Sequence, residues 1–210
     1  MKDLLKNRFA RSLGLTRIVD VNFYQNTGSL TFTDNKSCSD CESKTASIFA
    51  ECTDKTVLKA HFGNNNVCFI ELEKFLDQFA NVSYLAKGGK CDLMMYDDIK
   101  CVFVELSCLN AKYLEDNDNK LGKKTKARQQ LYNTILKLQK SPDVAGKINS
   151  YQIKQAIFAY REKNKITTGD KIEKTMSVFN MTSKISKMYM SKMEYGFTFV
   201  NIEYPNVYQW

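Results

Sequence analysis

The apolar positions in the middle of the chain fall into two short runs separated by a polar pair. The runs cover Cys91–Tyr96 and Ile99–Leu106, and Asp97-Asp98 lies between them. Two such runs joined by two turn-forming residues predict a hairpin of two antiparallel strands. The rest of the pattern is arranged around this hairpin.

Elsewhere the pattern predicts helices and further strands. Apolar residues spaced three and four apart indicate helices, and short apolar runs bounded by turn residues indicate strands. The expected helices are Lys2–Leu13, Phe69–Phe79 and about 18 residues around Ala127–Leu138, ended by Pro142 and Gly146. The expected strands are Val82–Leu85, Ala156–Tyr160 and Phe197–Tyr204, together with Arg17–Tyr24 and Ser29–Thr33 on either side of a hairpin loop at Asn26–Gly28. Chain breaks or turns are expected at Gly63–Asn66 and Gly88-Gly89.

These elements predict an α/β protein with a central mixed sheet flanked by helices. The chain has 210 residues, 43% of them hydrophobic, which is enough to bury a sizeable core. Because it contains no internal repeat and no low-complexity linker, we expect a single domain over residues 1–210. Within it we expect an N-terminal helix and hairpin with a cysteine-containing loop over 1–68, a core over 69–161, and a C-terminal helix and strand over 162–210.

Charge adds an expected partner to this picture. The formal net charge is +8, which favours a polyanionic partner over an acidic small molecule. Basic residues gather where the long helix is expected to begin, and helix N-termini already favour anions. The candidate nucleic-acid-binding residues are Lys120, Lys123, Lys124, Lys126 and Arg128.

The apolar runs and the cysteines indicate the compartment. No run approaches the roughly 20 apolar residues that a membrane helix needs, and the lysine-rich start lacks the apolar core of a signal peptide. We therefore expect a cytoplasmic protein with no membrane partner, whose seven cysteines are reduced thiols.

One group of cysteines could instead hold a structural zinc ion. Cys38 and Cys41 form a CxxC pair, and Cys52, His61 and Cys68 follow at irregular spacing. A zinc site usually closes with a second well-spaced pair, so these residues are either a zinc site or ordinary reduced cysteines. His61 is the only histidine, which argues against a catalytic triad.

The predicted hairpin contains two carboxylates that a buried strand does not need for its packing. An ionised carboxylate in such a strand costs roughly several kcal/mol unless it meets a cation. Side chains alternate along a strand, so Glu105 shares its face with Phe103 and Ser107. If the hairpin brings Asp92 near Glu105, the pair forms an oxygen site of the kind that magnesium and manganese prefer.

This arrangement resembles the PD-(D/E)XK nuclease superfamily, the restriction-endonuclease-like fold. An Asp opens one strand, a short turn follows, and the next apolar strand ends in Glu105-Leu106-Ser107. The resemblance implies that Asp92, Glu105 and the carbonyl of Leu106 bind Mg²⁺ or Mn²⁺. Cys91 stands where the family has proline, and Ser107 stands where it has the lysine that orients the attacking water. Serine is short and neutral, so it does not stabilise developing charge as an ammonium does.

The resemblance also implies roles for residues outside the hairpin. A helix before the Asp strand often supplies a third acid, for which Glu73 is the candidate. The helix after the Glu strand commonly carries a Gln-Leu pair that faces the site, here Gln130-Leu131. Some members move the essential lysine to a neighbouring element. The lysines that could replace it here are Lys124 and Lys126, with Lys90 and Lys112 as further options.

The resulting hypothesis is a Mg²⁺-dependent nuclease that hydrolyses phosphodiester bonds of DNA or RNA. Ser107 keeps an alternative open, a catalytically inactive member of the fold or a zinc-stabilised module that binds nucleic acid or a protein. An interaction protein with no nucleic-acid role is a third possibility, and it requires the basic residues to be scattered evenly over the fold. The sequence leaves a homodimer or a protein partner open.

Overall fold

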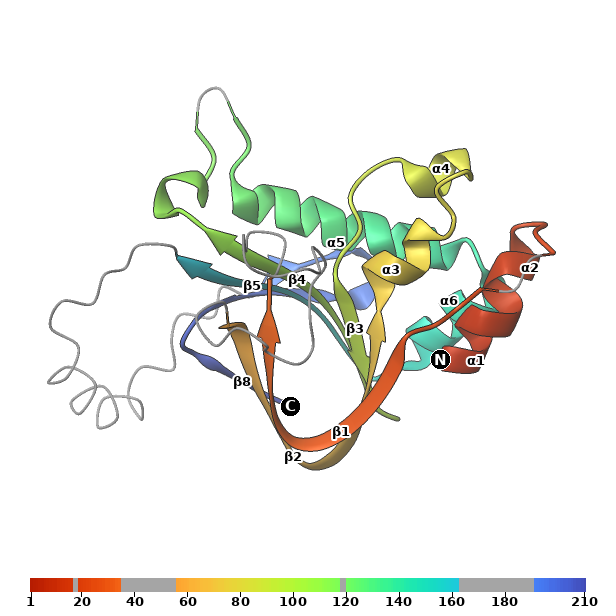
Figure 1. The fold of residues 1–210 in the computed structure, drawn as a ribbon, viewed down its shortest axis with the longest axis horizontal. Helices are drawn as coiled ribbons and strands as arrows, with labels where there is room; N and C mark the ends of the chain where they lie inside the picture. The colour runs from red at the N-terminus through yellow and green to blue at the C-terminus, as the bar shows by residue number, and fades with distance from the viewer. Residues whose placement is uncertain (17–18, 35–55, 118–119, 163–190) are drawn as a thin grey trace, which may run out of the picture.

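The computed structural model describes residues 1–16, 19–34, 56–117, 120–162 and 191–210 (Figure 1). The described strands join one eight-stranded sheet with the order β1-β2-β3-β4-β5-β7-β6, and β8 pairs with β2. The strands are β1 Phe23–Thr33, β2 Thr56–Glu71, β3 Leu93–Tyr96, β4 Lys100–Leu109, β5 Ile153–Glu162, β6 Ser191–Lys192, β7 Thr198–Glu203 and β8 Val207–Gln209. The helices are α1 Lys2–Leu4, the π-turn Leu5–Phe9, α2 Ala10–Ser12, α3 Leu72–Asp77, α4 Ser83–Ala86, α5 Lys123–Gln139, α6 Pro142–Ser150, and the 3₁₀ turns Ala111–Tyr113 and Glu194–Gly196.

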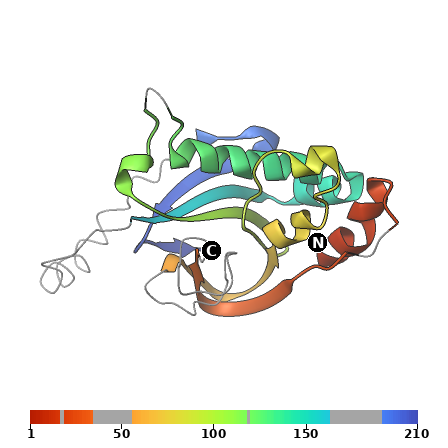
Figure 2. The ribbon, with the colours of Figure 1, turned by 45° about the horizontal axis from the view of Figure 1, so that its top comes forward.

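The sheet is mixed, and helices flank it. Strands β1 to β4 pair antiparallel in sequence, whereas β4, β5 and β7 run parallel. A parallel pair needs a long crossover, and α5 with α6 forms the one between β4 and β5. Figure 2 shows α5 lying across one face of the sheet. The prediction of an α/β protein with a mixed sheet is confirmed.

Each face of the sheet carries its own core. Phe103 and Phe158 pack with the helices, while Val104 and Ile157 belong to a second cluster on the opposite face. That second face is covered by residues of β1, β2 and β8, because β1 and β2 bend strongly and curl beneath the sheet (Figures 1 and 2). Glu105 lies two residues after Phe103 on β4, so its side chain lies on the same face of the sheet, the one that α5 covers. This is the face that the sequence predicted for it.

Two glycines make the bend in β1 and β2 possible. Gly28 and Gly63 are paired with each other, with φ of 77° and 58°, and the register shifts on both sides of Gly28. Positive φ costs glycine little, so both strands turn sharply at this point without ending. The predicted hairpin loop at Asn26–Gly28 and the predicted chain break at Gly63–Asn66 are therefore wrong. The division expected between residues 68 and 69 falls inside β2.

Two short apolar runs also differ from their predictions. Phe69 and Ile70 complete β2 by pairing with β3, so the helix expected from Phe69 is reduced to α3. Val82–Leu85, expected as a strand, leads into the short helix α4, with Leu85 buried in the core. The spacing of apolar residues alone does not distinguish a buried strand from one turn of a buried helix. For both runs, tertiary packing determines which of the two forms.

Near the C-terminus the predicted ends of elements need correction. Helix α5 ends at Gln139, before Pro142, which occupies the first turn of α6 where its missing N–H has no cost, and Gly146 lies inside α6. The strand predicted at the C-terminus is β7, but β8 follows it and pairs with β2. The N-terminal helix, the β3–β4 hairpin, the long helix α5 and the strand β5 are confirmed.

Candidate functional site

The β3–β4 hairpin brings the two carboxylates together. Leu93, the first residue of β3, pairs with Val104, and continuing this register by one residue brings Asp92 beside Glu105. Asp92 is 2% exposed and Glu105 is 7% exposed. The backbone N–H of Leu106 donates a hydrogen bond to Oδ2 of Asp92 at 2.7 Å. The expectation that the hairpin makes Asp92 and Glu105 neighbours is confirmed.

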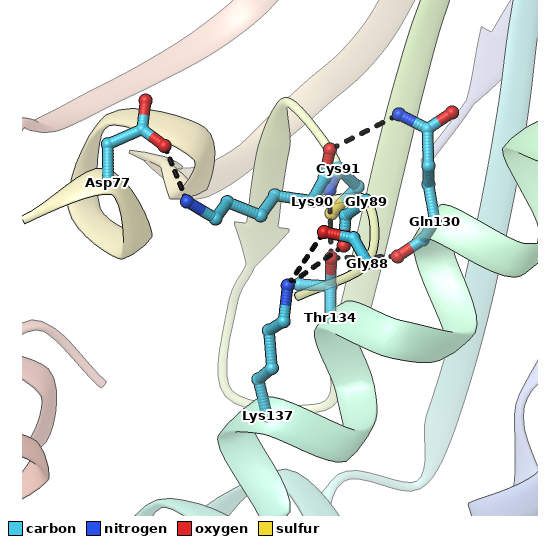
Figure 3. Close-up of polar contacts among 8 residues, drawn as sticks. All are labelled: Asp77, Gly88, Gly89, Lys90, Cys91, Gln130, Thr134 and Lys137. Carbon is cyan, nitrogen blue, oxygen red and sulfur yellow. Dashed lines mark hydrogen bonds and ion pairs between the residues drawn. The ribbon is translucent and has the colours of Figure 1, made fainter. Parts of the chain in front are cut away.

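Helix α5 reaches this pair through Gln130. Its side-chain amide Nε2 donates to Oε1 of Glu105 at 3.0 Å. The same nitrogen lies 3.5 Å from the carbonyl oxygen of Lys90 (Figure 3). Leu131, the next residue, is fully buried in the core. Gln130 therefore faces the acidic strand, as the resemblance implies, and it joins α5 to β4 and to the loop that precedes β3.

Two further α5 side chains fasten the loop that leads into Asp92. The ammonium of Lys137 donates to the carbonyl oxygens of Gly88 at 3.2 Å and Gly89 at 3.0 Å. Oγ1 of Thr134 accepts the backbone N–H of Cys91 at 2.8 Å and donates to the carbonyl of Gln130 at 2.9 Å (Figure 3). These contacts attach the loop to successive turns of α5. They therefore fix the position of Asp92, which follows the loop.

The two glycines of this loop allow its close approach to α5. A Cβ on Gly89 would lie 2.1 Å from Cγ of Gln130, and a Cβ on Gly88 would lie 2.7 Å from Nδ2 of Asn133. Gly88 also has a φ of +73°, which glycine adopts readily. The sequence predicted a turn at this pair but missed the contacts of Thr134 and Lys137; the doubled glycine was the available signal of a close backbone contact.

The candidate replacement lysines lie in different surroundings. Lys90 pairs with Oδ1 of Asp77 at 2.6 Å, and Lys124 with Oε1 of Glu115 at 3.4 Å. The ammonium of Lys112 lies 4.9 Å from the ring centre of Tyr113. Lys126 is exposed and precedes Gln130 by four residues, which places the two on one side of α5.

The motif serine itself is enclosed. Ser107 is 8% exposed and follows Glu105 by two residues, so the two side chains lie on the same face of β4. It pairs with Tyr160 on β5. A neutral hydroxyl therefore occupies the position at which the resemblance expects an ammonium.

The candidate third acid lies near the pair through its backbone. Glu73 lies in the first turn of α3, and its N–H points at the carbonyl of Asp92 at 3.4 Å. Within the ranges that the structure describes, no three His, Cys, Asp or Glu side chains form a group able to hold a metal ion. A metal site in this part of the chain would therefore depend on Asp92, Glu105 and the Leu106 carbonyl, without Glu73.

The structure describes only part of the predicted zinc site. Cys38, Cys41 and Cys52 lie outside the described residues. Cys68 lies in β2, where burial raises the pKa of its thiol. His61, on the same strand, is exposed, and its Nδ1 lies 2.8 Å from Oγ of Ser29.

The five predicted nucleic-acid-binding residues separate into two sets. Arg128 donates to the carbonyl of Lys192 at 3.0 Å and lies over the ring of Phe199, and Lys124 pairs with Glu115. The other three line a pocket of about 350 Å³ where α5 begins, and they are Lys120, Lys123 and Lys126.

Comparisons with known proteins give no relative. No family model, no curated protein and no solved structure matches the chain. None of the helices in the described ranges has the length and apolar character that a membrane crossing requires.

Proposed function

We propose that this protein is a metal-dependent nuclease that hydrolyses phosphodiester bonds of DNA or RNA. The observation that carries the proposal is the hydrogen bond from the Leu106 N–H to Asp92, which brings Asp92 beside Glu105, with both carboxylates nearly buried and Gln130 of α5 bonded to Glu105. Two adjacent carboxylates repel each other and contribute little to packing, so a strand pair that retains both calls for a reason other than folding.

The donor set suits a hard divalent cation. Two carboxylates and the Leu106 carbonyl offer oxygen ligands, which Mg²⁺ and Mn²⁺ prefer over the nitrogen and sulfur ligands typical of zinc. Hydrogen bonds from the Leu106 N–H and the Gln130 amide engage one oxygen of each carboxylate and orient it. Such an ion would polarise the scissile phosphate and lower the pKa of a bound water.

The order of elements supports the same reading. Strands β2, β3 and β4 pair antiparallel, α5 follows, and β5 returns parallel to β4. This is compatible with the acidic hairpin, helix and strand that the resemblance expects. Lysines at the start of α5 would neutralise backbone phosphates near the acid pair.

The alternative is a catalytically inactive protein of this kind that only binds nucleic acid. One observation favours it: Ser107 is neutral and enclosed, while Lys90 and Lys124 pair with carboxylates. If the protein is an active enzyme, Lys126 is the best-placed residue to supply the positive charge that Ser107 lacks, because it lies one turn from Gln130.

Calorimetric titration with Mn²⁺ tests the metal site. Wild type should bind the ion, and Asp92→Asn and Glu105→Gln should each abolish binding while leaving the far-ultraviolet circular dichroism spectrum unchanged. Asp98→Asn, which alters an exposed carboxylate on the same hairpin, is the matched control and should bind like wild type. Equal Mn²⁺ binding by all four proteins would remove the metal site.

Cleavage assays then separate the two readings. With Mg²⁺ or Mn²⁺ the wild type should cut DNA or RNA, and Lys126→Ala should slow cutting by about 10²- to 10³-fold at nucleic-acid concentrations that saturate the protein. An inert wild type that gains activity through Ser107→Lys would instead establish the inactive alternative.

A further inference from the structure

Each end of α5 borders a pocket that combines lysines with a tyrosine. At the N-terminal end, the pocket of about 350 Å³ is lined by Tyr113 together with Lys120, Lys123 and Lys126. Tyr113 is 53% exposed, and Lys112 adds a further positive charge over its ring. We call this the first lysine pocket.

A second pocket lies towards the other end of the helix. It has a volume of about 300 Å³ and is lined by Tyr84 of α4, Lys87, Asn133 and Lys140. Tyr84 is 46% exposed. Lys87 and Lys140 are exposed, whereas Lys137 at the base of the pocket is buried and bonded to loop carbonyls. We call this the second lysine pocket.

The two pockets lie on the same side of α5, and the loop that leads to Asp92 packs against the helix between them. Lys126, Gln130, Asn133, Lys137 and Lys140 follow one another at steps of three or four residues, the spacing of side chains that share one side of a helix. Gln130, which contacts Glu105, lies between the residues of the first pocket and those of the second. The rise of the helix separates Lys126 from Lys140 by about 21 Å along its axis.

We propose that this side of α5 binds a single strand of nucleic acid, with one segment in each lysine pocket. The lysines would contact backbone phosphates, and the tyrosine rings would stack on bases. The binding surface stands on the two pockets alone, and only its position around the scissile bond rests on the proposed nuclease function.

The tyrosines distinguish a single strand from a duplex. Stacking on a ring requires a base whose face is accessible, which holds for unpaired nucleotides and not for bases inside a duplex. Pockets of 300–350 Å³ are at the small end of ligand sites, of a size for one or two nucleotides and not for a double helix. Lysines without tyrosines would have suited either form, because they contact only phosphates.

The separation of the pockets sets a minimum length. About 21 Å corresponds to about six stacked nucleotides. A strand of four nucleotides can occupy one pocket, whereas a strand of twelve can occupy both. Joining two weak sites on one strand typically raises affinity about 100-fold or more without new contacts.

Fluorescence anisotropy with labelled oligonucleotides in EDTA tests this proposal without cleavage. Wild type should bind a single-stranded 12-mer about 100-fold more tightly than a 4-mer. Removing Lys87 and Lys140 together by alanine substitution should eliminate most of this gain and flatten the salt dependence by about 1.4 units. Tyr84→Ala and Tyr113→Ala should each weaken 12-mer binding by about fivefold or more.

Matched variants give the comparison. Lys6→Ala with Arg8→Ala removes two exposed charges from the N-terminal helix, and Tyr24→Ala removes an exposed ring from β1. Both should bind the 12-mer like wild type. Equal 12-mer binding by the second-pocket variant and its control would overturn the proposal. It would also be overturned if a 12-base-pair duplex bound as tightly as the single strand and the tyrosine substitutions left binding unchanged.

The same assay separates this proposal from the nuclease function. Asp92→Asn should bind the 12-mer in EDTA at least as tightly as wild type, because neither pocket uses the carboxylate and its loss removes a charge that repels phosphates. A protein that binds strands in this way but shows no Mn²⁺ site would refute the nuclease function and leave the strand-binding surface standing.

Discussion

Lys137 is a buried charge that holds the loop before Asp92 against α5. It is 5% exposed, and its ammonium contacts two carbonyl oxygens of the loop before Asp92. Burial lowers the pKa of Lys137, and the nearby charge of Lys90 lowers it further. The charged form is nevertheless the one that can donate to both carbonyls, so Lys137 has a structural task that a surface lysine does not have.

Replacing this ammonium should destabilise the protein. Lys137→Met keeps the length of the side chain but leaves the carbonyls of Gly88 and Gly89 without their charged donor. Hydrogen bonds to charged groups contribute about 1.5–3 kcal/mol, so we expect the free energy of unfolding to fall by about 2 kcal/mol in urea titrations. Lys140→Met, one turn away and exposed, should change it by less than about 0.5 kcal/mol. Equal effects of the two substitutions would contradict this role.

At this scale the sequence predicted the acid pair and Gln130 but not the residues that hold them in place. Asp92 and Glu105 were recognisable because a carboxylate in an apolar strand is conspicuous. Thr134 and Lys137 look like ordinary helix residues, and their partners lie more than 40 positions earlier in the chain. Side chains that bind backbone carbonyls leave no pattern in sequence, since any loop has carbonyls.

Among the elements, the start of α5 depends on the absence of a side chain. A Cβ on Gly122 would lie 2.3 Å from the carbonyl carbon of Glu115. Asp116 holds the same junction, because its carboxylate accepts the N–H of Gly122 at 2.6 Å and the hydroxyl of Thr125 at 3.0 Å. This packing of loop against helix forms one wall of the first lysine pocket.

A pair of glycine substitutions tests that junction. Gly122→Ala forces a backbone shift and should lower the free energy of unfolding by about 1–3 kcal/mol. Gly146→Ala, inside α6 where a Cβ meets nothing within 4 Å, should raise it by about 0.5–1 kcal/mol because alanine favours the helix. Thermal or urea unfolding of both proteins measures this opposite response. A Gly122→Ala protein as stable as wild type would show that the close contact with Glu115 is unimportant.

Element prediction succeeded where local pattern and tertiary packing agree. The β3–β4 hairpin and α5 carry strong local signals, and both formed where expected. It failed at Gly28 and Gly63, because glycine in a polar stretch usually marks a turn, whereas here the two residues pair and bend a continuous ribbon. That ribbon covers the second face of the sheet. Its course therefore depends on packing in the whole molecule and not on local sequence.

Across the whole molecule, the C-terminus closes the structure over the hairpin turn. Strand β8 adds to β2, and Tyr208 is 2% exposed in the core of the second face. The indole N–H of Trp210 donates to Oδ2 of Asp97 at 2.7 Å, across 113 positions of the chain. The ammonium of Lys100 lies 4.8 Å from the ring centres of both Tyr208 and Trp210. These two terminal aromatics therefore pack onto the domain.

Asp97 makes this closure sensitive to acid. Burial alone raises the pKa of its carboxyl, but hydrogen bonds from Trp210 and from the N–H groups of Lys100 and Ile99, with the charge of Lys100, outweigh burial and leave the pKa below its ordinary value. A carboxyl whose pKa is lowered on folding stabilises the native state fully above its unfolded pKa. That contribution is lost as the pH falls through the folded pKa, below about pH 4.

The difference between wild type and Asp97→Asn isolates this contribution from the other carboxyls. At pH 7 the variant should be less stable, because an amide does not accept the three hydrogen bonds as an anion does. As the pH falls below about 4, wild type should lose stability faster, so the two unfolding free energies converge. Urea titrations from pH 7 to pH 3 measure both, and Asp98→Asn, on the exposed side of the turn, should follow wild type throughout. A gap that stays constant with pH would mean that Asp97 holds the C-terminus through its shape and not through its charge.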